Sequence, residues 1–245
     1  MKKGKKILIL LFWLAVWQGL ALWMDRPILL VGPAETAAAL LRMAAEGDFW
    51  IAVFSSLVRI GGGFALAFFL GLALGTAAYF RPFLGELLAP VVTAMKTIPV
   101  ASFVILALIW AGADRLALVI SFLVVFPMIY LNTLAGLRST DPALLEMCEV
   151  FRVGWPQKVW NVYRPALASY LLSASQVALG MSWKSGIAAE VIGTPDYSIG
   201  EQLYMAKIYF TTNELLAWTV TVIALSFVFE KVIFALLKKV MEVRP

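Results

Sequence analysis

Hydrophobic residues in this chain form long runs that are separated by short polar segments. The runs are continuous and lack the alternation of apolar and polar residues that is typical of a half-buried strand. A helix rises about 1.5 Å per residue, so a run of roughly 20 residues is long enough to cross the hydrocarbon core of a bilayer. The pattern therefore predicts six membrane-spanning helices, at Ile7–Trp23, Ile51–Tyr79, Leu84–Trp110, Leu116–Leu137, Ala168–Ile187 and Leu215–Leu237.

The composition agrees with a bilayer as the solvent of this chain. Of its 245 residues, 62% are hydrophobic and 14% are charged, whereas soluble domains carry about 25% charged residues. Six spans and their connections use the whole length, so we predict an all-α membrane protein with a single domain, 1–245. Residues 1–50 would hold the first span and an amphipathic segment. Residues 51–245 would form the core of the protein, including a polar loop at 138–167.

The basic residues predict the orientation of the spans. If the lysines of the N-terminal MKKGKK lie inside, six crossings place Arg81, the polar loop and Arg244 inside as well. Cytoplasmic loops carry an excess of Lys and Arg, so both termini should be cytoplasmic. The first run is longer than a signal-peptide core and no cleavage site follows it, so we expect it to be retained. Few basic residues then remain outside, namely Arg26, Arg42, Arg115 and Lys207.

Two segments on the outer side are more than short connections. Pro33–Asp48 is rich in alanine and amphipathic, which predicts a helix on the surface. Gly193–Thr212 is long and contains Gly, Pro and Tyr. Long ordered loops are often functional, but a structural connector explains this segment equally well.

Small residues recur every four positions along the second span, at Gly63, Ala67, Gly71 and Gly75. This spacing leaves a smooth groove on one face, so that another helix can approach closely. The partner helix could belong to the same chain or to a second subunit. Pro99 and Pro127 lie inside the third and fourth spans, and each should kink its helix because it removes one backbone donor.

Several classes of function are disfavoured by what the sequence lacks. The chain has no His and a single Cys, Cys148, which argues against a His- or Cys-based metal site and excludes an internal disulfide. It contains no G-x-x-x-x-G-K-[ST] motif for binding ATP, and no clustered acids for general acid–base chemistry. The basic residues flank the spans, so the net charge of +5 does not indicate a nucleic-acid partner. We predict no catalytic residues, no metal and no cofactor bound by this chain.

The polar loop has the sequence features of two short helices. Ser139, Thr140 and Asp141 supply residues suited to capping a helix, and Pro142 suits the first helical position. The segment Gly154–Pro156 should end this helix, and a second one would run toward Pro165. The expected product is an amphipathic helix–turn–helix at the membrane surface. With no nucleophile or paired carboxylates, it is typical of a docking element.

The same loop resembles the EAA motif of ABC importer permeases. In that motif the sequence E-A-A is followed by a Gly and then by I-x-L-P. Glu146, Met147 and Cys148 stand at the E-A-A positions, and Arg152 stands at the position of the Gly. Val162, Arg164 and Pro165 stand for the Ile, the Leu and the Pro. Only Glu146 and Pro165 match by identity, so we expect the nearby Gly154 to take over the turn.

Three flanking segments strengthen this resemblance. Ser55–Gly75, Met95–Gly112 and Met181–Gly193 are similar to segments of the nitrate, taurine and sulfonate branch of these permeases. They occur in the expected order around the loop. The resemblance thus covers nearly the whole chain after the first span.

The resemblance implies a six-span type I ABC importer permease in the bacterial inner membrane. Two copies would form the solute path, with two ATP-binding subunits inside and a solute-binding protein outside. The polar loop would couple each copy to an ATPase subunit, which would hold the ATP and Mg²⁺. Glu146 would contact the ATPase surface, while Met147, Cys148 and Phe151 fill its groove.

Polar and basic residues within the spans are candidates for the path. Ser169, Ser173, Gln176, Gly180 and Lys184 lie on one helical face of the fifth span, next to Trp183. Such groups must face protein or water, so they either bond to neighbouring helices or line the path. Lys96, beside Thr97 and Pro99, must also find water or an anion, or extend to the interface.

We hypothesise that Lys96 and Lys184 favour an anionic solute such as a sulfonate, taurine or nitrate. Glu190 is the acid nearest to Lys184 in the sequence. A thiamine or pyrimidine precursor remains an alternative solute. A transporter driven by an ion gradient is an alternative of another class, but it would require carboxylates inside the spans, where this chain has few. A vitamin-binding subunit would not need the long polar loop.

Overall fold

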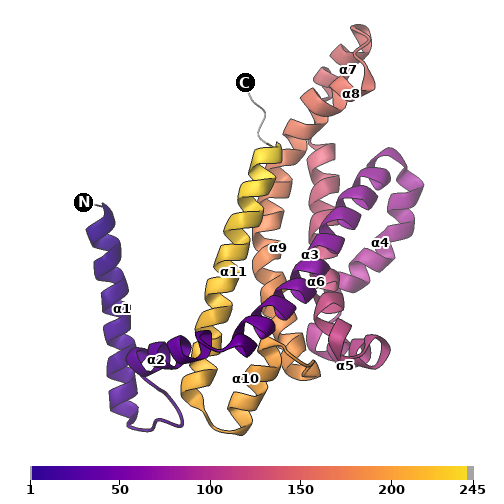
Figure 1. Ribbon diagram of the computed structural model, residues 1–245. Coiled ribbons are helices and arrows are strands. Elements are labelled where there is room, and N and C mark those ends of the chain that lie inside the picture. The colour runs from indigo at the N-terminus through magenta and orange to yellow at the C-terminus, as the bar shows by residue number, and fades with distance from the viewer. Residues whose placement is uncertain (1, 242–245) are drawn as a thin grey trace.

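The computed structural model describes residues 2–241, and every regular element in that range is a helix. The predicted all-α architecture is therefore confirmed for the described residues (Figure 1). The elements, in chain order, are α1 (Lys2–Met24), α2 (Pro33–Ala44), α3 (Gly47–Phe80), α4 (Pro82–Thr97), α5 (Val100–Ala111), α6 (Ala113–Arg138), α7 (Pro142–Val150), α8 (Trp155–Lys158), the π-helix η1 (Val159–Tyr163), α9 (Arg164–Gly193), α10 (Ile199–Ile208) and α11 (Thr212–Met241).

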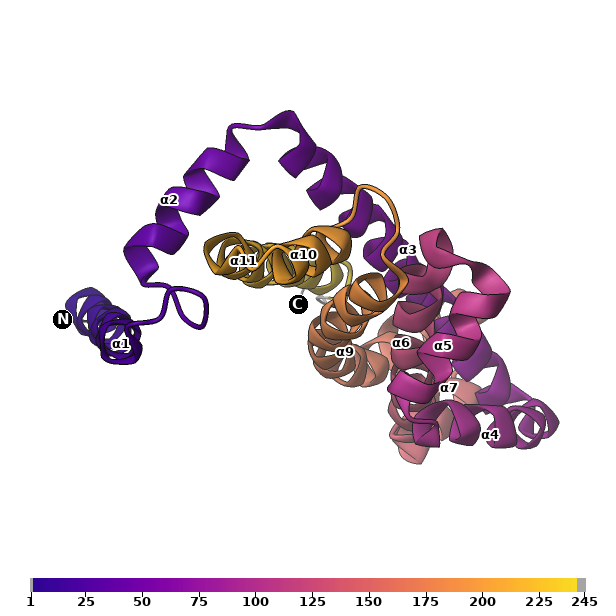
Figure 2. The same ribbon diagram turned by 90° about the horizontal axis from the view of Figure 1, so that it is seen from below.

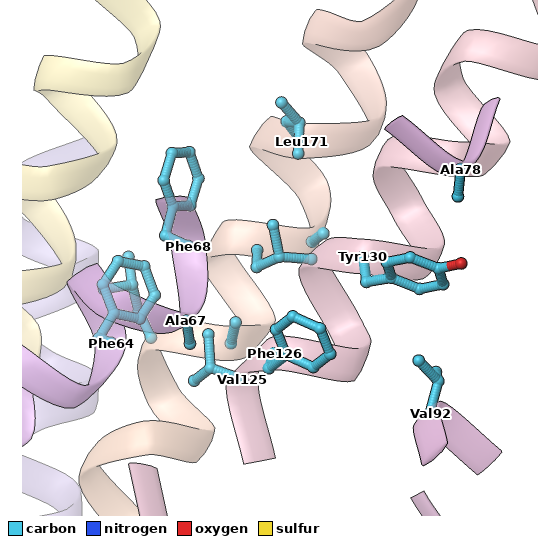
Figure 3. Close-up of a cluster of buried hydrophobic side chains, with 13 residues drawn as sticks. Phe64, Ala67, Phe68, Ala78, Val92, Val125, Phe126, Tyr130 and Leu171 are labelled. Atoms are coloured by element: carbon cyan, nitrogen blue, oxygen red, sulfur yellow. The ribbon is translucent and has the colours of Figure 1, made fainter. Parts of the chain in front are cut away.

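Helices α3, α6 and α9 form the packed centre of the molecule. Helix α6 lies between the other two, and α11 packs along α9 (Figures 1 and 2). Figure 3 shows the buried cluster between them, to which Phe64 of α3, Val125 of α6 and Leu171 of α9 contribute. Because apolar side chains from three helices interlock here, the three helices are held together as one unit.

The small-residue stripe of α3 packs against α6. A Cβ atom added to Gly63 would lie 2.4 Å from the backbone oxygen of Leu118, and one added to Gly75 would lie 2.8 Å from Cβ of Thr133. The backbones are close enough that larger residues would force the helices apart. The stripe, which includes the buried Ala67, therefore packs within the chain. It does not face a second subunit.

Among residues 2–241, four helices are long and apolar enough to cross a membrane, namely α1, α3, α6 and α11. The pair α4 and α5 becomes a fifth span if the two bent helices are counted together. Helix α9 has 30 residues and runs beside α6 and α11. Its serines and its glutamine lower the mean hydropathy of this helix. The six-span arrangement therefore remains a prediction for α4–α5 and for α9.

The third apolar run is not the single kinked helix that we expected. It is divided into α4 and α5, and the chain bends by 109° between them. Ile98 and Pro99, at the break, have extended backbone conformations. Proline has no amide hydrogen and disfavours a helical conformation in the residue before it. Pro127, in contrast, lies inside the continuous helix α6.

The polar loop lies at the same end of the molecule as the start of α1 and the end of α11. The start of α1 and the end of α11 point toward the same end of the molecule as α7 and α8, which we call the loop end (Figure 1). Helices α2, α5 and α10 lie toward the opposite end, which we call the far end. Helix α1 stands apart from the central helices (Figure 2). The predicted surface helix is confirmed as α2, which begins at Pro33.

Candidate functional site

The polar loop begins with the predicted helix cap. The side chain of Asp141 accepts a hydrogen bond of 2.8 Å from the amide of Ala143, and Pro142 opens α7. The cap satisfies one of the amides that have no partner within the helix, and proline has no amide hydrogen to satisfy. These two residues fix where α7 starts.

Helix α7 ends in a Schellman motif. The amide of Val153 donates to the oxygen of Cys148 at 2.9 Å, and the amide of Arg152 donates to the oxygen of Glu149 at 3.1 Å. Arg152 occupies the left-handed region, with φ of 51°. This conformation favours glycine, the residue that the EAA motif has at this position. Gly154 has an ordinary φ of −62°. Our expectation that it takes over the turn is therefore wrong, because Arg152 makes the turn itself.

One side of the helix–turn–helix carries exposed apolar side chains. Met147 and Phe151 lie on this surface beside the exposed Glu146, and 74% of Phe151 is accessible. Cys148 is only 5% exposed and faces the interior of the chain. We therefore correct the prediction that Cys148 fills a partner's groove. The apolar side chains with the largest exposure on the loop are Val150, Phe151, Trp155 and Trp160.

Aromatic rings connect the loop to the end of α3. Phe80 packs against Trp155 and Tyr163, with ring centroids 5.3 and 5.7 Å apart, and Tyr79 also contacts Tyr163. The rings of Phe80, Trp155 and Tyr163 border an apolar cavity of about 370 Å³ between the loop and the helices α3, α6 and α9. The loop is therefore attached to the bundle by packing as well as by the chain.

The second half of the loop passes into α9 without a break. Helix α8 is followed directly by η1 and then by α9. Pro165, in the first turn of α9, has no amide hydrogen to donate to the carbonyl of Asn161, and its ring would clash with that group in a regular α-helix. The wider π-helix at Val159–Tyr163 accommodates the proline. A displacement of the loop must therefore act directly on α9.

The predicted polar face of α9 is exposed in the single chain. Ser169, Ser173, Gln176 and Lys184 are exposed, and Gly180 is half-buried. For Ser173, Gln176 and Lys184, no side-chain hydrogen bond to other described residues is found. Trp183 points the other way. It is 1% exposed and packs against Phe229, with ring centroids 5.8 Å apart. The expectation that Trp183 lines the path is therefore corrected.

Lys96 faces a cavity of about 430 Å³ between α3, α4 and α6. Glu86, Tyr130 and Arg138 also line this cavity, and Lys184 is not among its lining residues. The hydroxyl of Thr97 donates to the backbone oxygen of Thr93 at 3.0 Å. Lys96 lies in the last turn of α4, just before the break at Pro99. The structure thus puts the two candidate lysines in different surroundings.

The structure gives Glu190 partners that sequence reasoning missed. Its Oε2 accepts a hydrogen bond of 2.7 Å from the hydroxyl of Ser56 and one of 3.3 Å from the amide of Gly200. Glu190 is fully buried, whereas Lys184 is exposed on another face of α9. Glu190 is therefore not the partner of Lys184. The sequence shows Glu190 as a single acid in an apolar segment, which indicates that it needs a polar partner. It does not indicate which distant residue donates the hydrogen bond.

The described residues offer no arrangement for metal chemistry. Within residues 2–241, no group of three or more His, Cys, Asp or Glu side chains could hold a metal ion. The candidate site therefore consists of a docking surface on the polar loop and an exposed polar face on α9.

Comparison with known proteins shows that the chain is similar to permeases of solute transport systems. A family model described as "Binding-protein-dependent transport system inner membrane component" matches residues 67–244. The chain is 27% identical to an aliphatic sulfonates transport permease protein of Bacillus subtilis over 207 residues, and this aligned segment covers 83% of this chain and 74% of that protein. It is 24% identical over 224 residues to the taurine transport system permease protein of Escherichia coli, with 89% of this chain and 81% of that protein covered. A nitrate import permease protein of Synechocystis is 27% identical over 143 residues, with 58% and 52% covered.

Proposed function

Because this chain belongs to the inner-membrane components of binding-protein-dependent transport systems, in the sulfonate, taurine and nitrate branch of ABC importer permeases, we propose that it moves a small anion across the membrane as one half of a permease dimer. An ATPase subunit supplies the energy by binding the polar loop. The observation that carries this proposal is the exposed apolar surface of α7, which continues through α8 and η1 into α9.

The loop surface has the chemistry of a docking element. Exposed apolar area costs about 25 cal/mol per Å², so the exposed side chains of Met147 and Phe151 favour a surface that covers them. A cleft on an ATPase subunit would cover these side chains, and Glu146 would contact its rim. Closure of two ATPase subunits on ATP would then move both loops, and with them both copies of α9. A conformational change requires such a differential contact.

The exposed polar face of α9 supports a second permease copy. Ser173, Gln176 and Lys184 would be costly if they faced lipid, so they require water or protein beside them. A second copy that presented the same face would enclose a polar path between two α9 helices.

The solute is proposed to be an anion that Lys96 and Lys184 help to accommodate. Three relatives are named for sulfonates, taurine and nitrate, all of which carry a negatively charged group. A lysine in a low-dielectric region attracts an anion strongly. In this arrangement the polar loop and both termini are cytoplasmic, and the far end meets an extracytoplasmic binding protein.

Reconstitution in liposomes tests the proposed function. The chain is purified with the ATPase subunit and the binding protein that are produced with it, and ATP-dependent uptake of taurine, a sulfonate and nitrate is measured. We expect uptake of at least one anion with the full set and none when the ATPase subunit is left out. Uptake that persists without ATP, or in a chain that lacks residues 142–158, would contradict the proposal.

A matched pair of variants tests the docking surface. Phe151→Ala should lower both uptake and the affinity for the ATPase subunit by tenfold or more, since a large buried contact at an interface is lost. Leu41→Ala serves as the control for the affinity for the ATPase subunit, because Leu41 on α2 is also 74% exposed but lies toward the far end, away from the polar loop. Equal effects of the two variants would exclude a specific role for Phe151.

A further inference from the structure

The buried carboxylate of Glu190 joins three helices at the far end. Ser56 of α3 donates its hydroxyl proton to Oε2 of Glu190 on α9 at 2.7 Å. The same hydroxyl oxygen accepts a hydrogen bond of 2.9 Å from the amide of Ile199, the first residue of α10. The amide of Gly200 donates directly to Glu190. One amide from the start of α10 therefore donates to the carboxylate directly, and a second is linked to it through the hydroxyl of Ser56.

Helix α10 touches α9 more closely at this point than any side chain would allow. A Cβ atom on Gly200 would lie 2.2 Å from Cβ of Glu190 and 2.4 Å from its carbonyl carbon. Only glycine fits here. The close approach brings the amide of Gly200 within reach of the carboxylate.

Arg59 extends the same joint to a fourth helix. Its Nη2 donates to Oδ1 of Asp114, in the first turn of α6, and to the backbone oxygen of Asp196, just before α10, both at 3.2 Å. Among the described residues, Nη1 of Arg59 and Oε1 of Glu190 are buried without a hydrogen-bond partner.

We propose that Glu190 is a positioning residue of the transport cycle, which fastens α10 to α9 so that both move together. This inference rests on the proposed function. The polar loop is continuous with the first turn of α9, and Glu190 lies near the other end of the same helix. The joint therefore lies where a displacement of α9, started by the ATPase subunit, reaches the far end. The reverse signal, from a binding protein docked at the far end, passes through the same contact.

The experiment compares ATP hydrolysis with and without the binding protein in the complete reconstituted complex. Glu190→Ala removes both hydrogen bonds and the charge. We expect basal hydrolysis to remain, while the stimulation by the solute-loaded binding protein falls at least fivefold. Glu190→Gln keeps an oxygen for Ser56 and Gly200 but cannot carry the charge of a carboxylate, so it should retain part of the stimulation. Ser56→Ala should resemble Glu190→Ala.

Ser175→Ala is the matched control. Ser175 also lies on α9, is fully buried and has a hydroxyl without a partner among the described residues. It should leave the ratio of stimulated to basal hydrolysis unchanged. Each variant is compared at equal amounts of assembled complex, so that a simple loss of folding does not change the ratio.

The outcomes separate this inference from the function on which it rests. Wild-type stimulation that persists fully in Glu190→Gln and in Ser56→Ala would overturn the positioning role, even if Glu190→Ala failed to assemble. An equal loss in Ser175→Ala would also overturn it. A wild-type complex that hydrolyses ATP without any response to the binding protein would contradict the proposed function itself, together with this role for Glu190.

Discussion

Phe80, the last residue of α3, packs edge-on against Trp155 at the turn of the polar loop, with ring centroids 5.3 Å apart. The two residues lie far apart in the sequence, and they join the loop to a helix of the packed centre. Tyr163 touches both rings. The loop is thus supported from two sides, because its chain continues into α9 while its aromatic side chains rest on α3.

Removal of the ring at Phe80 should weaken this support. An aromatic pair contributes about 0.5–1.5 kcal/mol beyond its area, so we expect Phe80→Ala to let the loop move independently of α3. Uptake should fall several-fold while binding of the ATPase subunit is kept, because the exposed surface of α7 is unchanged. The measurement is uptake per assembled complex.

Trp13→Ala provides a control for that variant. Trp13 forms a similar edge-on pair with Phe12, at 5.6 Å, but both residues are exposed on α1. It should transport normally. Normal uptake in Phe80→Ala, or an equal defect in both variants, would mean that the contact between Phe80 and Trp155 does not transmit motion.

The second prediction concerns the left-handed backbone conformation of Arg152. A residue other than glycine costs about 1 kcal/mol or more in this conformation. We expect Arg152→Gly to stabilise the loop by up to about 1 kcal/mol, although glycine also gains entropy in the unfolded chain. Gly154→Ala should change stability little, since φ of Gly154 suits any residue. Thermal unfolding of the purified complex, or proteolysis of the loop, measures both. A larger loss from Gly154→Ala than gain from Arg152→Gly would contradict this assignment of the turn.

The elements that local chemistry determines could be read from the sequence. Asp141 followed by Pro142 fixes the start of α7, and Pro33 fixes that of α2, because capping and proline geometry depend on a few neighbouring residues. The length of the apolar runs likewise predicted α3, α6 and α11. The small-residue spacing predicted a close helix contact, but it did not say which helix would make that contact.

Features that depend on distant residues could not be read in this way. Pro99 and Pro127 are the same residue type in similar apolar runs, yet only the first one divides its helix. Pro127 is buried in α6, which packs between α3 and α9, whereas Pro99 is exposed. Periodicity placed Trp183 next to the polar face of α9, but burial depends on which side meets α11. The partner of Glu190 is 134 residues away and follows no sequence pattern.

The contact between α3 and α6 gives a third prediction, with a control one residue away. Gly63→Ala would place Cβ 2.4 Å from the backbone oxygen of Leu118, which cannot move aside as a side chain can. We expect a loss of about 1–3 kcal/mol, as is typical of overpacking. Gly62→Ala meets only a side-chain carbon of Leu118 at 3.7 Å, which is an ordinary contact. Denaturation in detergent should give a much lower free energy of unfolding for Gly63→Ala than for Gly62→Ala. The reverse order would show that α3 packs differently.

The cavity beside Lys96 provides the last prediction, which concerns the solute. Lys96 and Arg138 line this cavity of about 430 Å³ together with a single acid, Glu86. No ion pair of Lys96 is found among residues 2–241, so its charge is free to act on a solute. Lys96→Met should therefore raise the KM for an anionic solute about tenfold, which corresponds to the loss of about 1.4 kcal/mol. The maximal ATPase rate should change less.

Lys231→Met is the control for that prediction, because Lys231 is also an exposed cation but lies on α11, where it contacts the ring of Phe227. It should leave the KM unchanged. The two variants separate a local attraction at α4 from a general effect of net charge, since each removes one positive charge from the chain. Unchanged KM values for taurine, a sulfonate and nitrate in Lys96→Met would remove Lys96 from the path. A KM that rises equally in both variants would assign the preference for anions to the field of the whole protein.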